Sequence, residues 1–362
     1  MRLGVEAALL GGELVPGDVE VADGRVVAGG LDGRNGRGIA APGFVDLQVN
    51  GFVGIDFFTA DAEGYRRIGE ALLRSGVTAY QPTFITSPEE ELVAALREVP
   101  QNRAAPRVLG AHLEGPFLAP ERLGSHPASA RRDPDPSLLE RLVGAGPVVH
   151  VTLAPELPGA LELIDLLRRG GITVACGHSN ATAAEARPAF ARGASTITHL
   201  FNAMRPFGAR EPGLAGAALA SPEVTVQVIV DGVHLADDTA KLVWQIAAGR
   251  FALVTDAMAG AGLGDGTYRL GSLEIDVSGG VPRRSDGVLA GSTLTMIEAV
   301  RNLVALGAPL AGALAAASEV PARIAGLTEI GRLEPGATAD IVVLDDGLEL
   351  ERVLVGGEDA LD

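Results

Sequence analysis

Metal-binding and proton-transferring side chains stand at one kind of position in this chain, the point where a short apolar run ends. Glu114 closes the run VLGAHLE, His178 closes ITVACGH, and His199 closes STITH. One carboxylate and two imidazoles are the ligand set of a catalytic zinc site, which keeps a fourth position open for water. A single histidine in such a place is more often a helix cap or the partner of a buried carbonyl. Three metal-type side chains in equivalent positions favour a metal centre.

A further carboxylate and a loop histidine could move protons near such a centre. Asp256 ends the apolar run FALVTD, where it could cap a following helix or act as a general base; beside a metal centre we favour the base. His126, in ERLGSHPASA, is either a solvated loop residue or a group that moves over a substrate. His150 is interpreted as structural. His112 points to the same side of its strand as Glu114 and is interpreted as support for the ligands.

A segment containing glycine and proline begins at His199 and reads HLFNAMRPFGAREPGLAGA. It supplies Asn202, Arg205 and Arg210. Backbone N–H groups and guanidinium groups together suit a phosphate. An ordinary surface loop with solvated arginines fits the composition equally well, so the residues alone leave both interpretations open.

Eight apolar strands are expected to position these side chains. They are expected at residues 43–50, 78–84, 108–114, 148–153, 172–178, 196–200, 226–231 and 251–256. Amphipathic segments such as GYRRIGEALLRSG, SLLERLVGAG and ALELIDLLRRGG separate them. Strands that alternate with helices imply an α/β fold of parallel βαβ units, and eight units imply a closed (β/α)8 TIM-like barrel with the active site at its carboxyl-end rim. An open doubly wound sheet is the alternative, but no glycine-rich phosphate fingerprint follows the first strand.

The two ends of the chain have a different character. Residues 1–41 and 330–362 alternate apolar and polar side chains around glycine turns, as short hairpin strands do. Neither piece could bury a core by itself, so the two are expected to pair into one small β-sandwich domain, with the barrel at 42–329. A hairpin insertion is expected near 267–289, followed by two helices, STLTMIEAVRNLVALG and LAGALAAASEVPARIAG.

Charge and cysteine content limit the partners and the compartment. The 362 residues carry a formal net charge of −17, which argues against nucleic acid or an anionic membrane surface as a partner. No run reaches the roughly 18 apolar residues that a membrane span needs. Cys176 is the single cysteine, which rules out an intramolecular disulfide and fits a reducing compartment. The chain is therefore expected to be cytoplasmic.

A set of motifs spread over nearly the whole chain resembles one enzyme family. In order they are PGFVDLQVNG, GVTAYQPTFITS, HLEGPF, VTLAPE, GHSNAT, THLFNAM, REPGLAG, DGVH, LVTDAM and LAGSTLTMIEAVRNLV. The chain resembles the N-acetylglucosamine-6-phosphate deacetylases of the amidohydrolase superfamily. The resemblance implies hydrolysis of the acetamido group of N-acetylglucosamine 6-phosphate to glucosamine 6-phosphate and acetate, a reaction of amino-sugar catabolism and recycling.

The resemblance also implies roles for the residues that could do chemistry. Glu114, His178 and His199 match the family's metal ligands, which implies one divalent metal ion per subunit, with Zn2+ the expected ion. Asp256 matches the catalytic acid/base, and His126 matches the loop histidine that polarises the acetyl carbonyl.

A second group of positions matches the family's phosphosugar contacts. These are Asn202, the backbone of Ala203, His234 and Arg210. Arg210 matches an arginine that reaches the phosphate from the neighbouring subunit, so the resemblance implies a homodimer.

The end of the first strand departs from the common superfamily pattern. Many amidohydrolases carry His-x-His there, whereas this chain has Gln48 and Asn50, whose neutral amides bind zinc poorly. One metal ion rather than two is therefore expected. Three rival functions remain: an amidohydrolase acting on a cyclic amide, nucleobase or dipeptide; a deacetylase of N-acetylgalactosamine 6-phosphate; and a non-catalytic sugar-phosphate binding protein on the same barrel.

Overall fold

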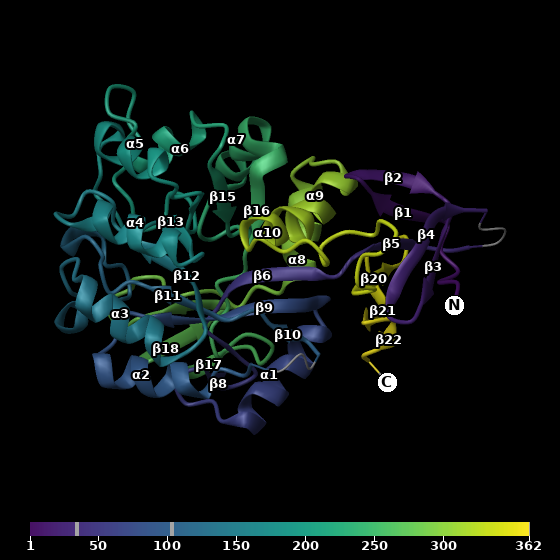
Figure 1. The fold of residues 1–362 in the computed structure, drawn as a ribbon, viewed down its shortest axis with the longest axis horizontal. Coiled ribbons are helices and arrows are strands. Elements are labelled where there is room, and N and C mark those ends of the chain that lie inside the picture. Colours follow the sequence, from purple (N-terminus) through teal and green to yellow (C-terminus); the bar gives the residue numbers. More distant parts are fainter. Residues whose placement is uncertain (33–35, 102–104, 362) are drawn as a thin grey trace.

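Eight parallel strands form a barrel in the structure, a computed structural model that describes residues 1–32, 36–101 and 105–361 (Figure 1). In barrel order they are β6 (Phe44–Val49), β9 (Val77–Ile85), β11 (Ala111–Glu114), β12 (Val148–Leu153), β13 (Thr173–Cys176), β14 (Thr196–Ile197), β15 (Thr225–Val228) and β16 (Phe251–Leu253). Neighbours from β6 to β16 pair in parallel, and a short strand β10 (Arg107–Val108) also pairs with β9. The predicted (β/α)8 barrel is confirmed.

The barrel closes between its last and first strands through the segment that follows β16. Asp256 N donates to Gln48 O at 2.9 Å, and Asn50 N donates to Ala257 O at 2.7 Å. A parallel bridge joins Val49 to Ala257. The seam of the barrel is therefore made by residues at the carboxyl ends of the strands, where the polar side chains were predicted to gather.

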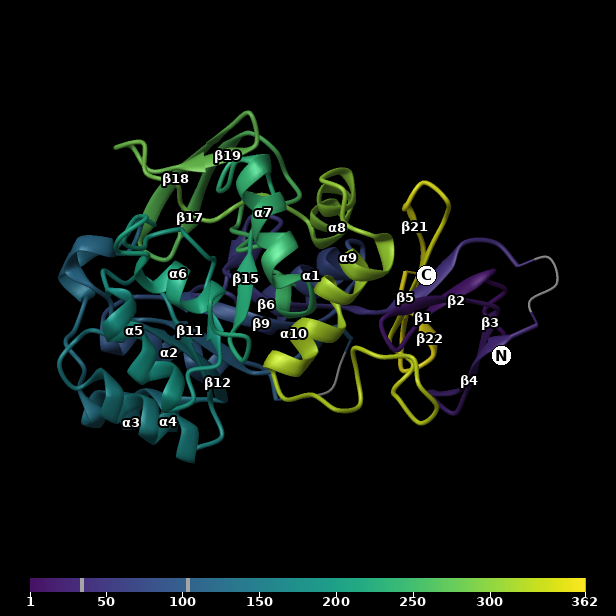
Figure 2. The same cartoon turned by 90° about the horizontal axis from the view of Figure 1, so that it is seen from above.

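Helices, most of them amphipathic, surround the barrel (Figures 1 and 2). They are α1 (Ala62–Leu73), α2 (Glu89–Glu98), α3 (Pro136–Ala145), α4 (Ala160–Arg169), α5 (Ala183–Ala191), α6 (Gly213–Leu219), α7 (Asp237–Ala247) and α8 (Met296–Ala305). In α4, for example, Leu163, Ile164 and Leu167 form one buried stripe, as the apolar spacing predicted. None of the helices in the described ranges is long and apolar enough to cross a membrane.

The two chain ends meet in one sheet beside the barrel, where Figure 1 places both termini. The sheet runs β2 (Glu13–Pro16), β1 (Ala7–Leu10), β5 (Ile39–Pro42), β20 (Ile341–Leu344), β21 (Leu350–Val355) and β22 (Glu358–Asp359). A hairpin of β3 (Asp18–Ala22) and β4 (Arg25–Leu31) covers it, and Val21 and Val26 share a buried cluster with Ile341. The predicted pairing of the ends into a small sandwich is confirmed. The predicted domain limits, 1–41 and 330–362 for the sandwich and 42–329 for the barrel, stay a prediction.

The insertion after the eighth strand is antiparallel, as predicted. It consists of β17 (Gly266–Leu270), β18 (Leu273–Ser278) and β19 (Val281–Arg283). The single helix predicted from LAGALAAASEVPARIAG is wrong, because the segment forms two helices, α9 (Leu310–Ala317) and α10 (Glu319–Ile324). The break lies at Ser318, with φ −130° and ψ −72°. Pro321 accounts for it, since a proline cannot donate to the carbonyl four residues earlier and its ring clashes with that carbonyl.

Several barrel strands end earlier than predicted, just before the polar residues of interest. The strands predicted to reach His178, His199 and Asp256 end at Cys176, Ile197 and Leu253. At those three polar residues the backbone has positive φ, with values of 46°, 27° and 52°. This left-handed region is unfavourable for residues other than glycine and is found mostly where function requires it. The chain therefore turns out of each strand at the residue that carries the chemistry.

Candidate active site

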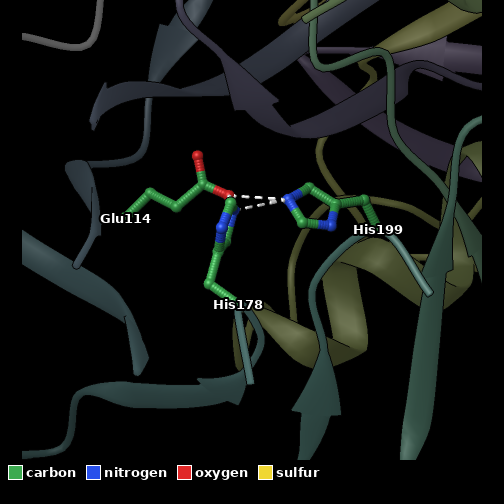
Figure 3. A group of neighbouring side chains, drawn as sticks. All are labelled: Glu114, His178 and His199. Carbon is green, nitrogen blue, oxygen red and sulfur yellow. Dashed lines mark hydrogen bonds and ion pairs between the residues drawn. The ribbon is translucent and has the colours of Figure 1, made fainter. Parts of the chain in front are cut away.

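Three side chains from three strand ends converge at the rim of the barrel (Figure 3). Glu114 Oε1 lies 2.8 Å from His199 Nε2 and 3.0 Å from His178 Nε2, and the two Nε2 atoms are 3.1 Å apart. All three residues are buried, and their ligand atoms lie within 4.8 Å of one another. This cluster could hold a metal ion, because one carboxylate oxygen and two imidazole nitrogens face a common point.

Hydrogen bonds outside the cluster hold its members in place. His178 Nδ1 lies 2.9 Å from the carbonyl oxygen of Arg122, which can only accept. His178 therefore carries its proton on Nδ1 and presents the lone pair of Nε2 to the cluster, as metal-binding histidines do. Gln48 Nε2 donates to Glu114 Oε1 at 3.2 Å. The amide at the end of the first strand thus orients a predicted metal ligand.

The protonation states of His178 and Glu114 suit metal binding, whereas the hydrogen bond and charge of Glu114 outweigh burial and raise the pKa of His199, so a metal ion would have to displace a proton there. Burial lowers the pKa of His178 to about 4, which keeps that ring in the neutral form that binds metals. Burial opposes ionisation of Glu114, but the surrounding histidines outweigh it and hold the pKa of that carboxyl well below its usual range. Glu114 is therefore an anion at neutral pH.

Asp256 lies at the same rim, with its carboxylate held by an amide. Asn50 Nδ2 donates to Asp256 Oδ1 at 2.7 Å. Burial, reinforced by the charge of Glu114, raises the pKa of Asp256 to about 6. A carboxyl with a pKa near 6 can take up and release a proton close to neutral pH, as a general acid/base must. The alternative of a helix N-cap is wrong, because the next element after β16 is β17.

His126 lies against the cluster rather than in solvent, and only 3% of it is exposed. Its Nδ1 accepts from Thr86 N at 3.2 Å and lies 2.9 Å from Thr86 Oγ1. Since a backbone N–H can only donate, the ring proton is on Nε2, which lies 3.4 Å from Glu114 Oε2. His126 therefore points an N–H donor at the centre of the site, and a solvated loop histidine is excluded.

These residues line one cavity of about 370 Å³ at the rim. The predicted site residues that line it are Glu114, His126, His178, His199, Asn202, Ala203, His234 and Asp256. Arg210 is exposed and does not belong to the lining of this single chain. A cavity of this size, with a few polar groups directed into it, suits a small-molecule ligand.

Two groups at the mouth escaped the sequence interpretation. Asp231 Oδ2 lies 2.7 Å from His234 Nδ1, so that histidine is fixed by a carboxylate three residues before it. Arg283 reaches the cavity from the β17–β19 insertion. The Asp-x-x-His spacing of the first pair was a usable signal. No local pattern marks Arg283.

A second pair of histidines lies inside the barrel, apart from the metal-type cluster. His112 and His150 stack with ring centroids 4.1 Å apart. Thr83 Oγ1 and Thr152 Oγ1 bind the two ring nitrogens of His112 at 3.2 and 2.8 Å, and no hydrogen bond joins it to Glu114. The prediction that His112 supports the metal ligands is therefore wrong, because its ring contacts two threonines instead.

Comparison with known families and curated proteins gives a consistent result. Residues 39–359 match the model of the amidohydrolase family. The mouse N-acetylglucosamine-6-phosphate deacetylase is 38% identical over 97% of this chain and 93% of its own length. The N-acetylgalactosamine-6-phosphate deacetylase of Escherichia coli O157:H7 is 37% identical over 88% of this chain and 87% of its own.

Solved structures agree with this result. A mutant of the N-acetyl-D-glucosamine-6-phosphate deacetylase from Mycobacterium smegmatis, in complex with N-acetyl-D-glucosamine-6-phosphate, has a TM-score of 0.95 and 39% identity, covering 100% of this chain and 99% of that one. The N-acetylglucosamine-6-phosphate deacetylase from Thermotoga maritima has a TM-score of 0.94 and 34% identity, covering 99% of both chains.

Proposed function

This chain belongs to the amidohydrolase family, and from that premise we propose that it hydrolyses the acetamido group of N-acetylglucosamine 6-phosphate to glucosamine 6-phosphate and acetate. It is a hydrolase of a linear amide bond. The observation that carries the proposal is the convergence of the Glu114–His178–His199 cluster, Asp256 and His126 in one cavity. Acid/base and metal-type groups within reach of one ligand are what amide hydrolysis needs.

One divalent ion per subunit, with Zn2+ the expected ion, would be held by Glu114, His178 and His199. The donor set fits, since a carboxylate and two neutral imidazoles are a common catalytic zinc set. With its proton on Nδ1, His178 directs the lone pair of Nε2 into the cluster, where it lies 3.0 Å from Glu114 Oε1 and 3.1 Å from His199 Nε2. An ion bound there would supply Lewis acidity toward the acetyl carbonyl and would lower the pKa of bound water. Elemental analysis of the purified protein tests its identity, and absence of any divalent metal would contradict the assignment.

Asp256 and His126 divide the remaining work. Asp256, ionised above pH 6 or so, takes a proton from the attacking water and returns it to the departing nitrogen. His126 Nε2–H donates a hydrogen bond to the acetyl oxygen as negative charge grows on it. Asn50 keeps the Asp256 carboxylate aimed at the cavity, and Thr86 keeps the His126 donor there.

Asn202, the N–H of Ala203 and His234 bind the phosphosugar at the open side of the cavity. All three residues line it. The backbone at Ala203 has φ 49°, in the left-handed region that recurs in anion-binding turns. Asp231 fixes the ring of His234 and leaves Nε2 for the ligand.

Arg210 reaches the phosphate of the neighbouring subunit, in a homodimer. Arg210 is exposed and lies near exposed Phe207, whose ring packs against Gly216 of α6. Leu242 and Ile246 are exposed one turn apart on the neighbouring helix α7. Exposed apolar side chains over adjacent helices are typical of an interface. Sedimentation velocity tests the dimer, and a monomer at assay concentration would refute it.

The enzyme acts in the cytoplasm, where its single, fully buried cysteine stays reduced. Fractionation of cells that express the chain, followed by detection with an antibody, tests this placement. Recovery in an extracytoplasmic fraction would contradict it.

Release of free amine and acetate from N-acetylglucosamine 6-phosphate by the zinc-loaded protein tests the proposed reaction. N-acetylglucosamine and N-acetylgalactosamine 6-phosphate are run beside it, since a relative that is named for the galacto isomer is 37% identical to this chain. Strong turnover of the phosphorylated gluco substrate alone is the expected result. Preference for the galacto isomer would keep the reaction and change the sugar. Turnover of none, with metal confirmed bound, would overturn the function and favour a binding protein.

Asp256→Asn is expected to lower kcat by about 100- to 10,000-fold, the range that a general acid/base contributes. Asparagine keeps the shape of the side chain but cannot accept a proton. Metal content and thermal unfolding should stay as in the unmodified chain, because Asp256 is not part of the ligand set. Substantial remaining turnover with normal metal content would refute the assigned role.

A further inference from the structure

A guanidinium group with no assigned role lines the active-site cavity. Among the described residues, Arg283 is the one arginine or lysine in the lining. It comes from β19, in the insertion after the eighth strand. Its Nη1 donates to the carbonyl of Gly287 at 2.8 Å, and within the described ranges no carboxylate pairs with it. The adjacent Arg284, by contrast, is paired with Asp286.

Contacts on either side of Arg283 place β19 beside two loops of the site. At one end, Val281 lines a neighbouring cavity together with Asp231 and Val233, beside the loop of His234. Just beyond the other end, Arg284 Nη1 donates to the carbonyl of Ser125 at 3.3 Å, beside His126. Figure 2 shows the insertion rising above the barrel near α7. Arg283 thus lies between the proposed sugar-phosphate contacts and the proposed catalytic loop.

The charges inside one subunit leave a phosphate dianion without a cation of its own. Glu114 and Asp256 would offset the two charges of a divalent ion. His234 shares its proton with Asp231, and burial of Asp231 is outweighed by that contact, which lowers its pKa. The His234–Asp231 pair therefore carries no net positive charge. Asn202 is neutral, so Arg283 is the positive group that this subunit offers in the cavity lining.

We propose that Arg283 is a specificity-determining residue that recognises the phosphate of the substrate from within the same subunit. The idea rests on the proposed function and deepens it. The guanidinium keeps its one bond to Gly287 and turns its remaining N–H donors toward the phosphate oxygens. A substrate without the phosphate gains nothing from this group. Arg283 acts on binding of the phosphorylated substrate, and it takes no part in the proton transfers at Asp256.

Arg283→Met tests the proposal, since methionine keeps much of the apolar stem and removes the charge. The KM for N-acetylglucosamine 6-phosphate should rise about tenfold, the lower end of the range for a charge-assisted hydrogen bond, because Arg283 is exposed. The kcat should stay within about threefold, and kcat/KM for N-acetylglucosamine should not change. Arg283→Lys should restore part of the affinity. Arg269→Met, the same charge change on β17 outside the cavity lining, is the matched control.

The outcomes separate this inference from the function on which it rests. If the unmodified chain prefers the phosphorylated sugar and Arg283→Met keeps that preference within twofold, the role of Arg283 is overturned and the function stands. An equal loss on both sugars would also overturn it, because the strand would then act only as a cover. Calorimetric titration with inorganic phosphate gives a reading that needs no turnover. Weaker phosphate binding by Arg283→Met supports the proposal, and unchanged binding overturns it, whichever substrate the enzyme prefers.

Discussion

Two pairs of buried histidines lie inside one barrel, and they differ in what their nitrogens contact. One pair, here called the lower pair, consists of His112 and His150. Both ring nitrogens of His112 are bound by threonine hydroxyls, and His150 Nδ1 lies 2.9 Å from Gln81 Oε1. In the rim pair, His178 and His199 face each other nitrogen to nitrogen, 3.1 Å apart. Neutral donors and acceptors satisfy the lower pair almost completely. In the rim pair both Nε2 atoms face the carboxylate of Glu114, and so the pair can bind a cation.

The two pairs also differ in backbone conformation. His112 and His150 belong to the regular strands β11 and β12. His178 and His199 have positive φ. Such a residue costs of order 1–3 kcal/mol and persists only where the surrounding fold imposes it. The comparison teaches that residue type and burial do not mark a ligand. Convergence of ring nitrogens on one carboxylate, together with a strained backbone, does.

The largest effect should follow from breaking the rim pair. His199→Ala removes one of the three donors and should lower turnover by about 1,000-fold or more, since a catalytic metal ion supplies several kcal/mol of transition-state stabilisation. Metal content should fall with it. Kinetics and elemental analysis on the same preparation measure both.

His150→Phe is the matched change in the lower pair, because it keeps a ring against His112. Metal content and kcat should stay within about threefold of the unmodified chain, at the cost of leaving Gln81 without its partner. If both variants lost the metal, the distinction between the two pairs would be wrong.

A smaller effect, on stability rather than turnover, should follow from loosening the lower pair. Thr152 Oγ1 lies 2.8 Å from His112 Nε2 and 2.7 Å from Thr198 Oγ1, and the residue is fully buried. Thr152→Val keeps the volume and leaves both partners unsatisfied. The free energy of unfolding should fall by about 1–3 kcal/mol, as measured by denaturant titration, while kcat and metal content stay nearly unchanged. A loss of metal with unchanged stability would contradict the structural role assigned to the lower pair.

The sequence was sufficient for the barrel and for the composition of the rim. Strand-end positions are a consequence of βαβ topology, so Glu114, His178, His199 and Asp256 could be brought together without any contact being known. The partner of each side chain could not be predicted in this way. His112 shows the limit: alternation placed it inside, beside Glu114, but its hydroxyl partners come from two neighbouring strands whose register only the fold sets.

The partners of the amides Gln48 and Asn50 could not be predicted from the sequence either. Gln48 and Asn50 were interpreted by what they lack, the imidazoles of a second metal site. In the structure they hold the carboxylates of Glu114 and Asp256. Contacts between the first strand and residues 66 and 206 positions away depend on barrel closure, and local spacing carries no trace of them.

The smallest predicted effect is the pH dependence of kcat/KM, which also distinguishes the rim of the barrel from the lower pair. Burial and the charge of Glu114 raise the pKa of Asp256 from 3.8 to about 6, and a bound cation would lower it, so its midpoint should lie between those values. The base form is lost as pH falls through that midpoint. The kcat/KM should therefore decline with a slope of one on the acid side, by up to about tenfold at pH 5.

Acid also acts on the lower pair, but through stability. Burial lowers the pKa of His112 to about 4, below its value of 6.5 in an unfolded chain. Between pH 6.5 and 4 the unfolded chain thus binds more protons than the folded chain, so the free energy of unfolding falls as the pH is lowered through this range. Kinetics at pH 5 to 8, with circular dichroism at each point and a return to pH 7.5, separate the two effects. Activity should fall before any unfolding and recover fully. If activity and structure were lost together, the acid limb would belong to the lower histidines rather than to Asp256.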